Sequence, residues 1–277
     1  MTETIEFRIP ESDASKHLPD SLGTKLGIAR RVELSFADPL VAQIGEIDRE
    51  FRSRGDAFFT AWVVHRHYTT IELAEAEIFA VSIKKVFEPA GEECGTQYDD
   101  RLSCGLCGGG RRQITPLFLN GARIPSRVDI CQTIAGEVVA SRRCVDVFRQ
   151  RKIDGVTFEA VRLANSGGTQ SEEHYRLIPG TESVRLADAT RVGDNPFDHA
   201  QAGRCPNGDV VGLNLLSEVW IQRPTCSNND VVATRELIGV RRGLLRPRPL
   251  LLISPRARLA IDDSKLKGFV LEVAHLT

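Results

Sequence analysis

Apolar and polar residues follow two different periodic patterns in the first third of the chain. Strict alternation in "RRVELSF" predicts a strand, whereas apolar residues three and four apart in "DPLVAQIGEIDREFRSRG" predict an amphipathic helix. Asp38 is the expected N-cap of that helix, Pro39 its first turn, and Gly55 lies past its end. Thr69 or Thr70 can cap a second, shorter helix. We expect strands at 30–36, 57–68 and 79–89 and helices at 38–55 and 70–78.

The periodicity stops between Pro89 and Arg112, where Gly, Asp and Cys dominate and turns are expected. Beyond this segment, "QITPLFL" is typical of a strand, and "SRVDICQTIAG" (126–136) is typical of a short helix or turn. Strand-like runs return at 210–221 and 231–242.

An internal repeat links two distant segments, because residues 137–161 align without a gap on residues 250–274. Each copy has the pattern of a buried strand, a Ser-capped helix of about ten residues, a glycine after the helix, and a returning strand. The shared order of elements predicts two equivalent units. The identical pairs are Ser141 and Ser254, Arg143 and Arg256, Lys152 and Lys265, Gly155 and Gly268, and Glu159 and Glu272.

These patterns predict an α+β or α/β protein with mixed sheets, short helices, two similar strand–helix–strand units and a zinc-knuckle insertion at about 90–112. The stretch near 163–173 is rich in Gly, Ser and Asn and is the best candidate for a boundary. We therefore expect regions 1–165 and 166–277, with a single compact domain as the alternative.

Composition narrows the function classes. The chain has 277 residues, a formal charge of -1, 42% hydrophobic and 26% charged residues, so no overall field attracts nucleic acid or anionic membrane. Neither a membrane-spanning apolar run nor a secretory signal pattern is present in the sequence. We expect a soluble protein of the reducing cytoplasm, where seven cysteines favour metal binding over disulfides.

The stretch "EECGTQYDDRLSCGLCGGGRR" carries the strongest chemical signal. Cys104 and Cys107 form a CxxCG knuckle, in which two thiolates can hold one tetrahedral ion and the glycine permits the turn. Cys94 is the expected third ligand of a structural zinc. The alternative is a set of reduced, unligated loop thiols. Three glycines after Cys107 argue against the helix start that a redox CxxC motif needs.

Several residues are candidates for the remaining zinc ligand, namely Cys131, His65, His67, Cys205 or a carboxylate. A second metal site is a further hypothesis, made of Cys205, Cys226 and His199. Cys131 and Cys144 lie in apolar surroundings and are interpreted as small hydrophobic residues.

An enzyme is the third function considered. His65 and His67 lie two apart on an expected strand, so their rings share a face, and Glu75 and Glu77 could bind Mg²⁺. A solvated face explains each of these groups as well. No P-loop, HExxH or Ser-His-Asp pattern occurs in the sequence.

Basic clusters suggest nucleic-acid binding as the alternative function. The run "VRRGLLRPRP" could contact phosphates, but acidic residues are interleaved along the chain and only 6% of residues are aromatic. The arginines concerned are Arg241, Arg242, Arg246 and Arg248.

Together, "CGLCGGG", the two strand–helix–strand units and the ending "KLKGFVLEVAHL" resemble the bacterial double-CXXCG motif proteins, some of which are immunity proteins paired with secreted toxins. The resemblance covers mainly 90–161 and 229–274. It implies a zinc-stabilised bacterial cytoplasmic protein that binds a protein partner and does not catalyse. Cys104 and Cys107 match one full motif, whereas at the other Cys94 is followed by Gly95, and Gln97 stands where a cysteine is expected.

The favoured hypothesis is thus a zinc-stabilised binding protein that occludes the active site of a toxin. Its candidate anchors are Trp62, Trp220 and the arginines of 241–248, because aromatic and arginine side chains dominate binding energy. Core positions are the alternative for both tryptophans.

Overall fold

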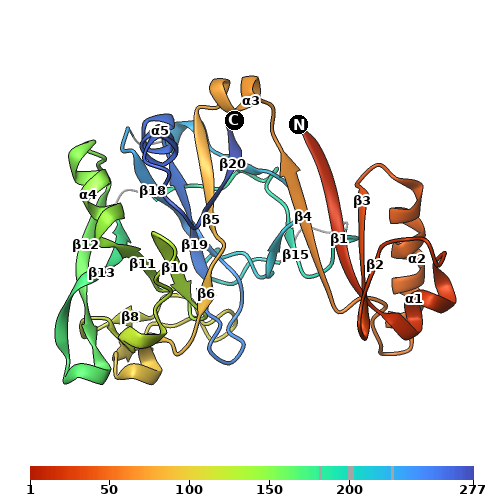
Figure 1. Ribbon diagram of the computed structural model, residues 1–277, viewed down its shortest axis with the longest axis horizontal. Coiled ribbons are helices and arrows are strands. Elements are labelled where there is room, and N and C mark those ends of the chain that lie inside the picture. Colours follow the sequence, from red (N-terminus) through yellow and green to blue (C-terminus); the bar gives the residue numbers. More distant parts are fainter. Residues whose placement is uncertain (181–182, 199–202, 226–227) are drawn as a thin grey trace. The chain divides into compact units, whose positions relative to one another are not determined.

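The computed structural model describes residues 1–180, 183–198, 203–225 and 228–277. Within these residues the chain forms five α-helices and five β-sheets, and two of the sheets mix parallel and antiparallel strands (Figure 1). The expected mixed α/β character is confirmed. No described helix is long and apolar enough to cross a membrane. Contacts divide the chain into two units, Met1–Ala74 with Asn195–His199, and Glu75–Asp194 with Ala200–Thr277.

The N-terminal unit is built on a four-stranded antiparallel sheet of order β2-β3-β1-β4. Alternate residues of strand β1, namely Ile5, Phe7 and Ile9, are fully buried. They pack with Val41 and Ile44 of helix α2, the longest helix described. The strands are β1 (Thr2–Pro10), β2 (Thr24–Leu26), β3 (Ala29–Ser35) and β4 (Ala61–His67), and the helices are α1 (Glu11–His17), α2 (Pro39–Ser53) and α3 (Thr70–Glu75).

Helix α2 begins as the sequence predicts, because the Asp38 carboxylate accepts the backbone N–H of Leu40 at 2.9 Å. Gly45 on this helix leaves room for a segment distant in sequence, since a Cβ there would lie 2.9 Å from the Phe197 ring. The Asn195 amide donates to the buried Asp48 carboxylate at 2.8 Å. Residues 195–198 are therefore built into the N-terminal unit.

The first six-stranded sheet of the larger unit has the order β6-β10-β11-β13-β12-β9. Its four inner strands pair antiparallel, and each short edge strand pairs parallel to its neighbour. The elements are β6 (Val86–Phe87), β9 (Phe118–Leu119), β10 (Ile130–Thr133), β11 (Val138–Ser141), α4 (Arg142–Gln150), β12 (Val156–Leu163) and β13 (Thr169–Pro179). Strand β10 replaces the helix or turn expected at 126–136, because a short buried apolar run has no distinctive period.

The second six-stranded sheet has the order β14-β18-β19-β5-β20-β17 and the same pairing senses. Its inner face buries an apolar cluster that includes Val184, Ile221, Val232 and Leu252. The elements are β5 (Ile78–Ile83), β14 (Ser183–Val184), β17 (Val219–Ile221), β18 (Val231–Ile238), β19 (Arg248–Ile253), α5 (Pro255–Asp263) and β20 (Phe269–Leu276).

The two sheets match strand for strand, and this match extends to two small antiparallel hairpins. We call residues 78–163 the first repeat and residues 169–276 the second. In chain order, each repeat has a first strand, an edge strand, a hairpin, a second edge strand, two inner strands, a helix and a last strand. The hairpins are β7 (Tyr98–Asp99) with β8 (Arg112–Gln113), and β15 (Val192–Gly193) with β16 (Asn214–Leu215).

The repeats exchange their first strands. Strand β5 of the first repeat lies between β19 and β20 of the second, and β13 of the second lies between β11 and β12 of the first (Figure 1). Each six-stranded sheet therefore takes five strands from one repeat and a central strand from the other, so neither sheet is complete without both repeats.

Equivalent hydrogen bonds tie the repeats together. Asp129 accepts the Ser141 hydroxyl at 3.0 Å and the backbone N–H of Lys267 at 2.8 Å. In the matching place, Asp230 accepts the Ser254 hydroxyl at 2.6 Å and the N–H of Asp154 at 3.2 Å. Each serine also caps its helix, as the sequence predicts. The aspartates thus link each helix start to the loop that follows the other repeat's helix.

The loops after the two helices approach the opposite repeat closely. A Cβ on Gly155 would lie 2.1 Å from the Val231 carbonyl oxygen, and one on Gly268 would lie 2.2 Å from that of Ile130. Both glycines have positive φ, as expected from the repeat. Only glycine satisfies the conformation and the contact together.

The expected boundary at 163–173 corresponds to the turn of the β12–β13 hairpin inside one sheet. The Gly and Asn residues that suggest a linker there instead form a tight turn, with Gly167 and Gly168 both at positive φ. The unit division lies elsewhere, near residue 74.

Candidate metal centre

The first hairpin holds the CxxCG knuckle in a tight loop. The N–H of Gly108 donates to the Cys104 carbonyl at 2.8 Å, and the N–H of Cys104 donates to that of Gly109 at 2.7 Å. Gly108 has a φ of +76°, and a Cβ on it would lie 2.7 Å from Cβ of Arg241. The Gly109 N–H points at Cys107 Sγ at 3.3 Å, the arrangement that stabilises a thiolate.

The second hairpin carries a matching loop, "CPNGD", at 205–209. The N–H of Gly208 donates to the Cys205 carbonyl at 2.8 Å, and the N–H of Cys205 donates to that of Asp209 at 2.9 Å. Gly208 has a φ of +87°. The loop is thus closed by the same kind of bonds as the first knuckle.

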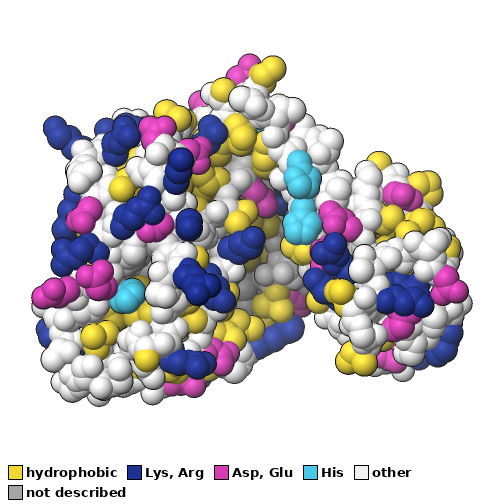
Figure 2. All heavy atoms as spheres, in the orientation of Figure 1, with side chains coloured by type: hydrophobic (Ala, Val, Ile, Leu, Met, Phe, Trp, Pro, Cys, Tyr) yellow, Lys and Arg dark blue, Asp and Glu magenta, His cyan; other side chains and the backbone are white. Residues whose placement is uncertain are grey.

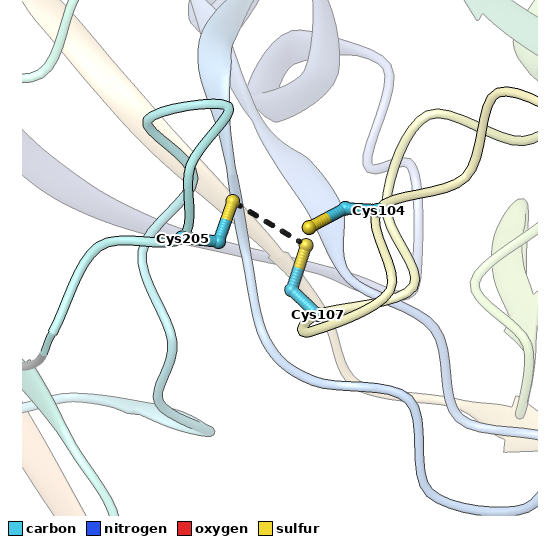
Figure 3. A group of neighbouring side chains, drawn as sticks. All are labelled: Cys104, Cys107 and Cys205. Carbon is cyan, nitrogen blue, oxygen red and sulfur yellow. Dashed lines mark hydrogen bonds between the residues drawn. The ribbon is translucent and has the colours of Figure 1, made fainter.

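The two loops bring three thiols together. Figure 3 shows Cys104, Cys107 and Cys205 with their sulfur atoms directed at one another, and these sulfurs all lie within 4.8 Å of each other. Cys107 Sγ and Cys205 Sγ are 3.6 Å apart although the residues are 98 positions apart in sequence. Away from these two loops, no group of three Cys, His, Asp or Glu side chains in the described part of the chain is placed to hold an ion.

The surroundings of Cys104 and Cys107 shift the pKa values of the two thiols in opposite directions. Burial raises the pKa of Cys107 to about 12, whereas backbone N–H groups of Cys107 and Leu106 lower the pKa of Cys104. Cys107 and Cys205 are buried and Cys104 is half-buried. A cation among the sulfurs would replace the thiol protons and compensate the charge that burial disfavours.

Cys94, the third ligand expected from the sequence, is not a member of this group. It ends a short 3-10 helix, Gly91–Cys94, that contacts β9, and burial raises the pKa of its thiol. Thr96 Oγ1 accepts the N–H of Phe118 at 2.8 Å and fixes this turn against β9. Cys205, one of the alternatives weighed for the remaining ligand, takes the third position because the second hairpin meets the first.

Two other cysteines have the apolar settings that the sequence suggests. Cys131 and Cys144 are buried, and burial raises both pKa values to about 12. The hypothesis of a second site depends on His199 and Cys226, which lie outside the described residues.

The residues proposed for catalysis form no such centre among the described residues. His65 and His67 both lie on β4 of the N-terminal unit. In the larger unit, Arg223 pairs with Glu77 at 2.8 Å and lowers the pKa of that carboxyl. An open cavity of 560 Å³ contains none of these groups and is lined by residues such as Glu159, Arg162 and Arg176.

The arginines of 241–248 are largely occupied by contacts within the larger unit. Arg242 pairs with Asp194 at 3.3 Å, and Arg246 pairs with Glu92 at 3.0 Å. Burial lowers the pKa of Arg248, whose guanidinium contacts the Gln132 side chain. The backbone N–H of Arg241 donates to the Cys107 carbonyl at 2.9 Å. Arg241 therefore braces the knuckle, while the other three arginines are held by residues elsewhere in the larger unit.

Neither protein-family models nor curated proteins match this sequence. The kinship with double-CXXCG proteins therefore stays a prediction, based on the knuckle and the repeat.

Proposed function

We propose that this chain is a non-catalytic binding protein whose paired hairpins are fastened by a structural zinc ion on Cys104, Cys107 and Cys205. The convergence of three thiols from two repeats carries the proposal. Thiolates select zinc over the hard cations, and tetrahedral sulfur-rich sites on loops are characteristic of structural zinc. The glycine-rich loop around the knuckle has little apolar surface of its own to bury, so an ion supplies the fixed point.

The position of apolar side chains supports partner binding at the first hairpin. Leu102 and Leu106 lie on the knuckle loop and are 76% and 60% exposed. Exposed leucines on a loop held by metal need little ordering on binding, which favours affinity. Trp62 and Trp220, the anchors suggested by the sequence, suit this role less well, because Trp62 packs against the core and Trp220 stacks on His275. We assign the contact to the leucines.

A protein partner fits the surface better than nucleic acid does. Figure 2 shows basic side chains interspersed with acidic ones on the visible face of the larger unit, whereas phosphate binding needs a basic patch. The likeness to immunity proteins suggests a secreted toxin as the partner, neutralised by occlusion. The nucleic-acid alternative predicts affinity for DNA or RNA that falls steeply with added salt.

Zinc content tests the metal part of the proposal. Purified protein should contain about one zinc per chain by elemental analysis, and a Cys104→Ser, Cys107→Ser variant should lose it together with thermal stability. Cys94→Ser is the matched control, because Cys94 lies in the same segment but outside the thiol group. Zinc-free wild-type protein, or zinc lost only in Cys94→Ser, would refute the site.

The binding part needs the partner. Co-expression with the product of a neighbouring toxin-like reading frame should give a complex, and Leu102→Asp with Leu106→Asp should weaken it by at least about 10-fold, because charge then enters a desolvated contact. Ile28→Asp, a change at a 92% exposed apolar residue of the N-terminal unit, is the control. An equal loss in both variants, or none in either, would contradict docking at the knuckle loop.

A further inference from the structure

We propose that Asp209 is the fourth protein ligand, so that the ion is held by three thiolates and one carboxylate oxygen. This inference rests on the zinc site proposed above and adds a residue that the CxxC pattern does not contain. Asp209 belongs to the second hairpin, four positions after Cys205.

Distances between ligand atoms carry the argument. Asp209 Oδ2 lies 3.5 Å from Cys107 Sγ and 3.6 Å from Cys205 Sγ, and the two sulfurs are 3.6 Å apart. Around a tetrahedral zinc ion with ordinary bond lengths, two sulfurs are separated by about 3.8 Å, and a sulfur and a carboxylate oxygen by about 3.6 Å. The three atoms therefore have the spacing of one triangular face of a tetrahedral site, with Cys104 as the fourth corner. Asp209 is not among the atoms that lie within 4.8 Å of all three sulfurs, so the bound ion would have to draw Cys104 and Asp209 closer together.

The second oxygen of Asp209 fixes the direction of the first. Oδ1 accepts the backbone N–H of Leu237 at 3.0 Å, which leaves Oδ2 facing the sulfurs. Such a hydrogen bond to the far atom of a ligand orients it before the metal binds. One-oxygen coordination is the mode that this geometry favours.

Burial gives an independent reason. Asp209 is only 7% exposed, and no lysine or arginine of the described chain forms an ion pair with it. A buried carboxylate without a cationic partner is costly, so such groups pair with cations or coordinate metals. A dication beside Oδ2 would supply the missing positive charge.

The opposite loop is shaped around this carboxylate. A Cβ on Gly109 would lie 3.0 Å from Asp209 Oδ2 and 3.2 Å from Cys107 Sγ. Glycine therefore lets the first loop close over both ligand atoms.

The match between the two hairpin loops explains why position 209 is an aspartate and not a cysteine. "CGLCG" in the first loop corresponds to "CPNGD" in the second, where Gly208 stands three residues after Cys205 in place of a second cysteine. The carboxylate oxygen of aspartate is one bond further from Cα than a thiol sulfur is. Asp209 can thus reach the ion from the next position along the chain.

Cobalt(II) substitution tests the assignment with the full-length protein. Asp209→Asn preserves the shape and an acceptor for the Leu237 N–H but offers a poor metal ligand. It should lower cobalt and zinc affinity by at least about 10-fold, the loss seen even for outer-shell partners. Asp209→Glu, which keeps a carboxylate, should bind cobalt more tightly than Asp209→Asn, because an anionic oxygen is still available to the ion. Asp188→Asn, at an exposed carboxylate that precedes β15 and pairs with Arg204 of the hairpin loop, is the control.

The outcomes separate this inference from the zinc proposal. If wild-type protein and Asp209→Asn bind cobalt with equal affinity and identical spectra, while Cys205→Ser loses the ion, the zinc site stands and the assignment of Asp209 fails. Loss of cobalt binding in a Cys226 or His199 variant but not in Asp209→Asn would likewise assign the fourth position elsewhere. Wild-type protein that binds no metal, with Cys107 and Cys205 joined as a disulfide, overturns both.

Discussion

Arg30 has a completely buried side chain in the N-terminal unit, and Glu11 at the start of α1 neutralises it. Two bonds join the groups, Arg30 Nε to Glu11 Oε2 at 3.0 Å and Arg30 Nη2 to Glu11 Oε1 at 2.6 Å. A third guanidinium nitrogen donates to the Pro19 carbonyl at 3.0 Å. The hydrogen bond from Arg30 lowers the pKa of Glu11 from 4.5 to about 2.

This shift fixes the sign of a pH effect. Because the pKa of Glu11 is lower in the folded than in the unfolded state, its stabilisation is complete above pH 4.5 and is lost as the pH falls toward 2. Glu11→Gln should therefore lower the urea midpoint of the N-terminal unit at pH 7, and the difference from wild type should vanish near pH 2. Trp62 fluorescence in a Trp220→Phe background reports this unit.

Glu50→Gln, at an exposed carboxylate of α2, provides the comparison and should change the midpoint little at either pH. A deficit in Glu11→Gln that is as large at pH 2 as at pH 7 would show that packing, not charge, is responsible.

At the scale of the element, the sequence predicts what is encoded locally. Asp38, Ser141 and Ser254 cap helices as expected, because a cap depends on neighbours within three positions. Lys152 and Lys265 adopt left-handed backbone conformations after α4 and α5. The alignment of the two lysines does not by itself predict this conformation. Strand β10 is missing from the predicted elements because short apolar runs lack a clear period. Strand β1 is missing too, although Ile5, Phe7 and Ile9 alternate along it and signal a half-buried strand.

The residues of the candidate metal centre likewise fall into those that local sequence predicts and those that it does not. Cys104 and Cys107 follow from their spacing, whereas Cys205 and Asp209 come from a loop about a hundred positions away. Their proximity depends on the pairing of the hairpins, which no local pattern encodes. The nearer Cys94 is thus the expected but not the observed neighbour, because distance in sequence says little about distance in the fold.

For the whole molecule, the strand exchange predicts how the chain behaves when cut. A break at the Gly167–Gly168 turn leaves β5 on one fragment and β13 on the other, so each six-stranded sheet lacks its central strand. Residues 1–167 and 168–277, produced separately, should give no cooperative unfolding of the larger unit. Produced together, they should co-purify as a one-to-one complex with about one zinc, because the ligands come from both fragments.

A control cut at Gly27, an exposed loop residue of the N-terminal unit, tests whether any break in the chain abolishes cooperative unfolding of the larger unit. This cut should leave that unfolding cooperative. If the fragment 168–277 alone unfolds cooperatively, the exchanged strands are not required for its sheet.

The exchange of β5 and β13 also has a consequence for how this protein can change over generations. Joining two identical chains that swap a strand end to end would give this topology, and in such an ancestor every mutation would alter both knuckles at once. Once the copies share a chain, each mutates alone. One loop can then keep its pair of cysteines while the other replaces a thiolate with a carboxylate, and the two faces around the ion become free to specialise for different neighbours.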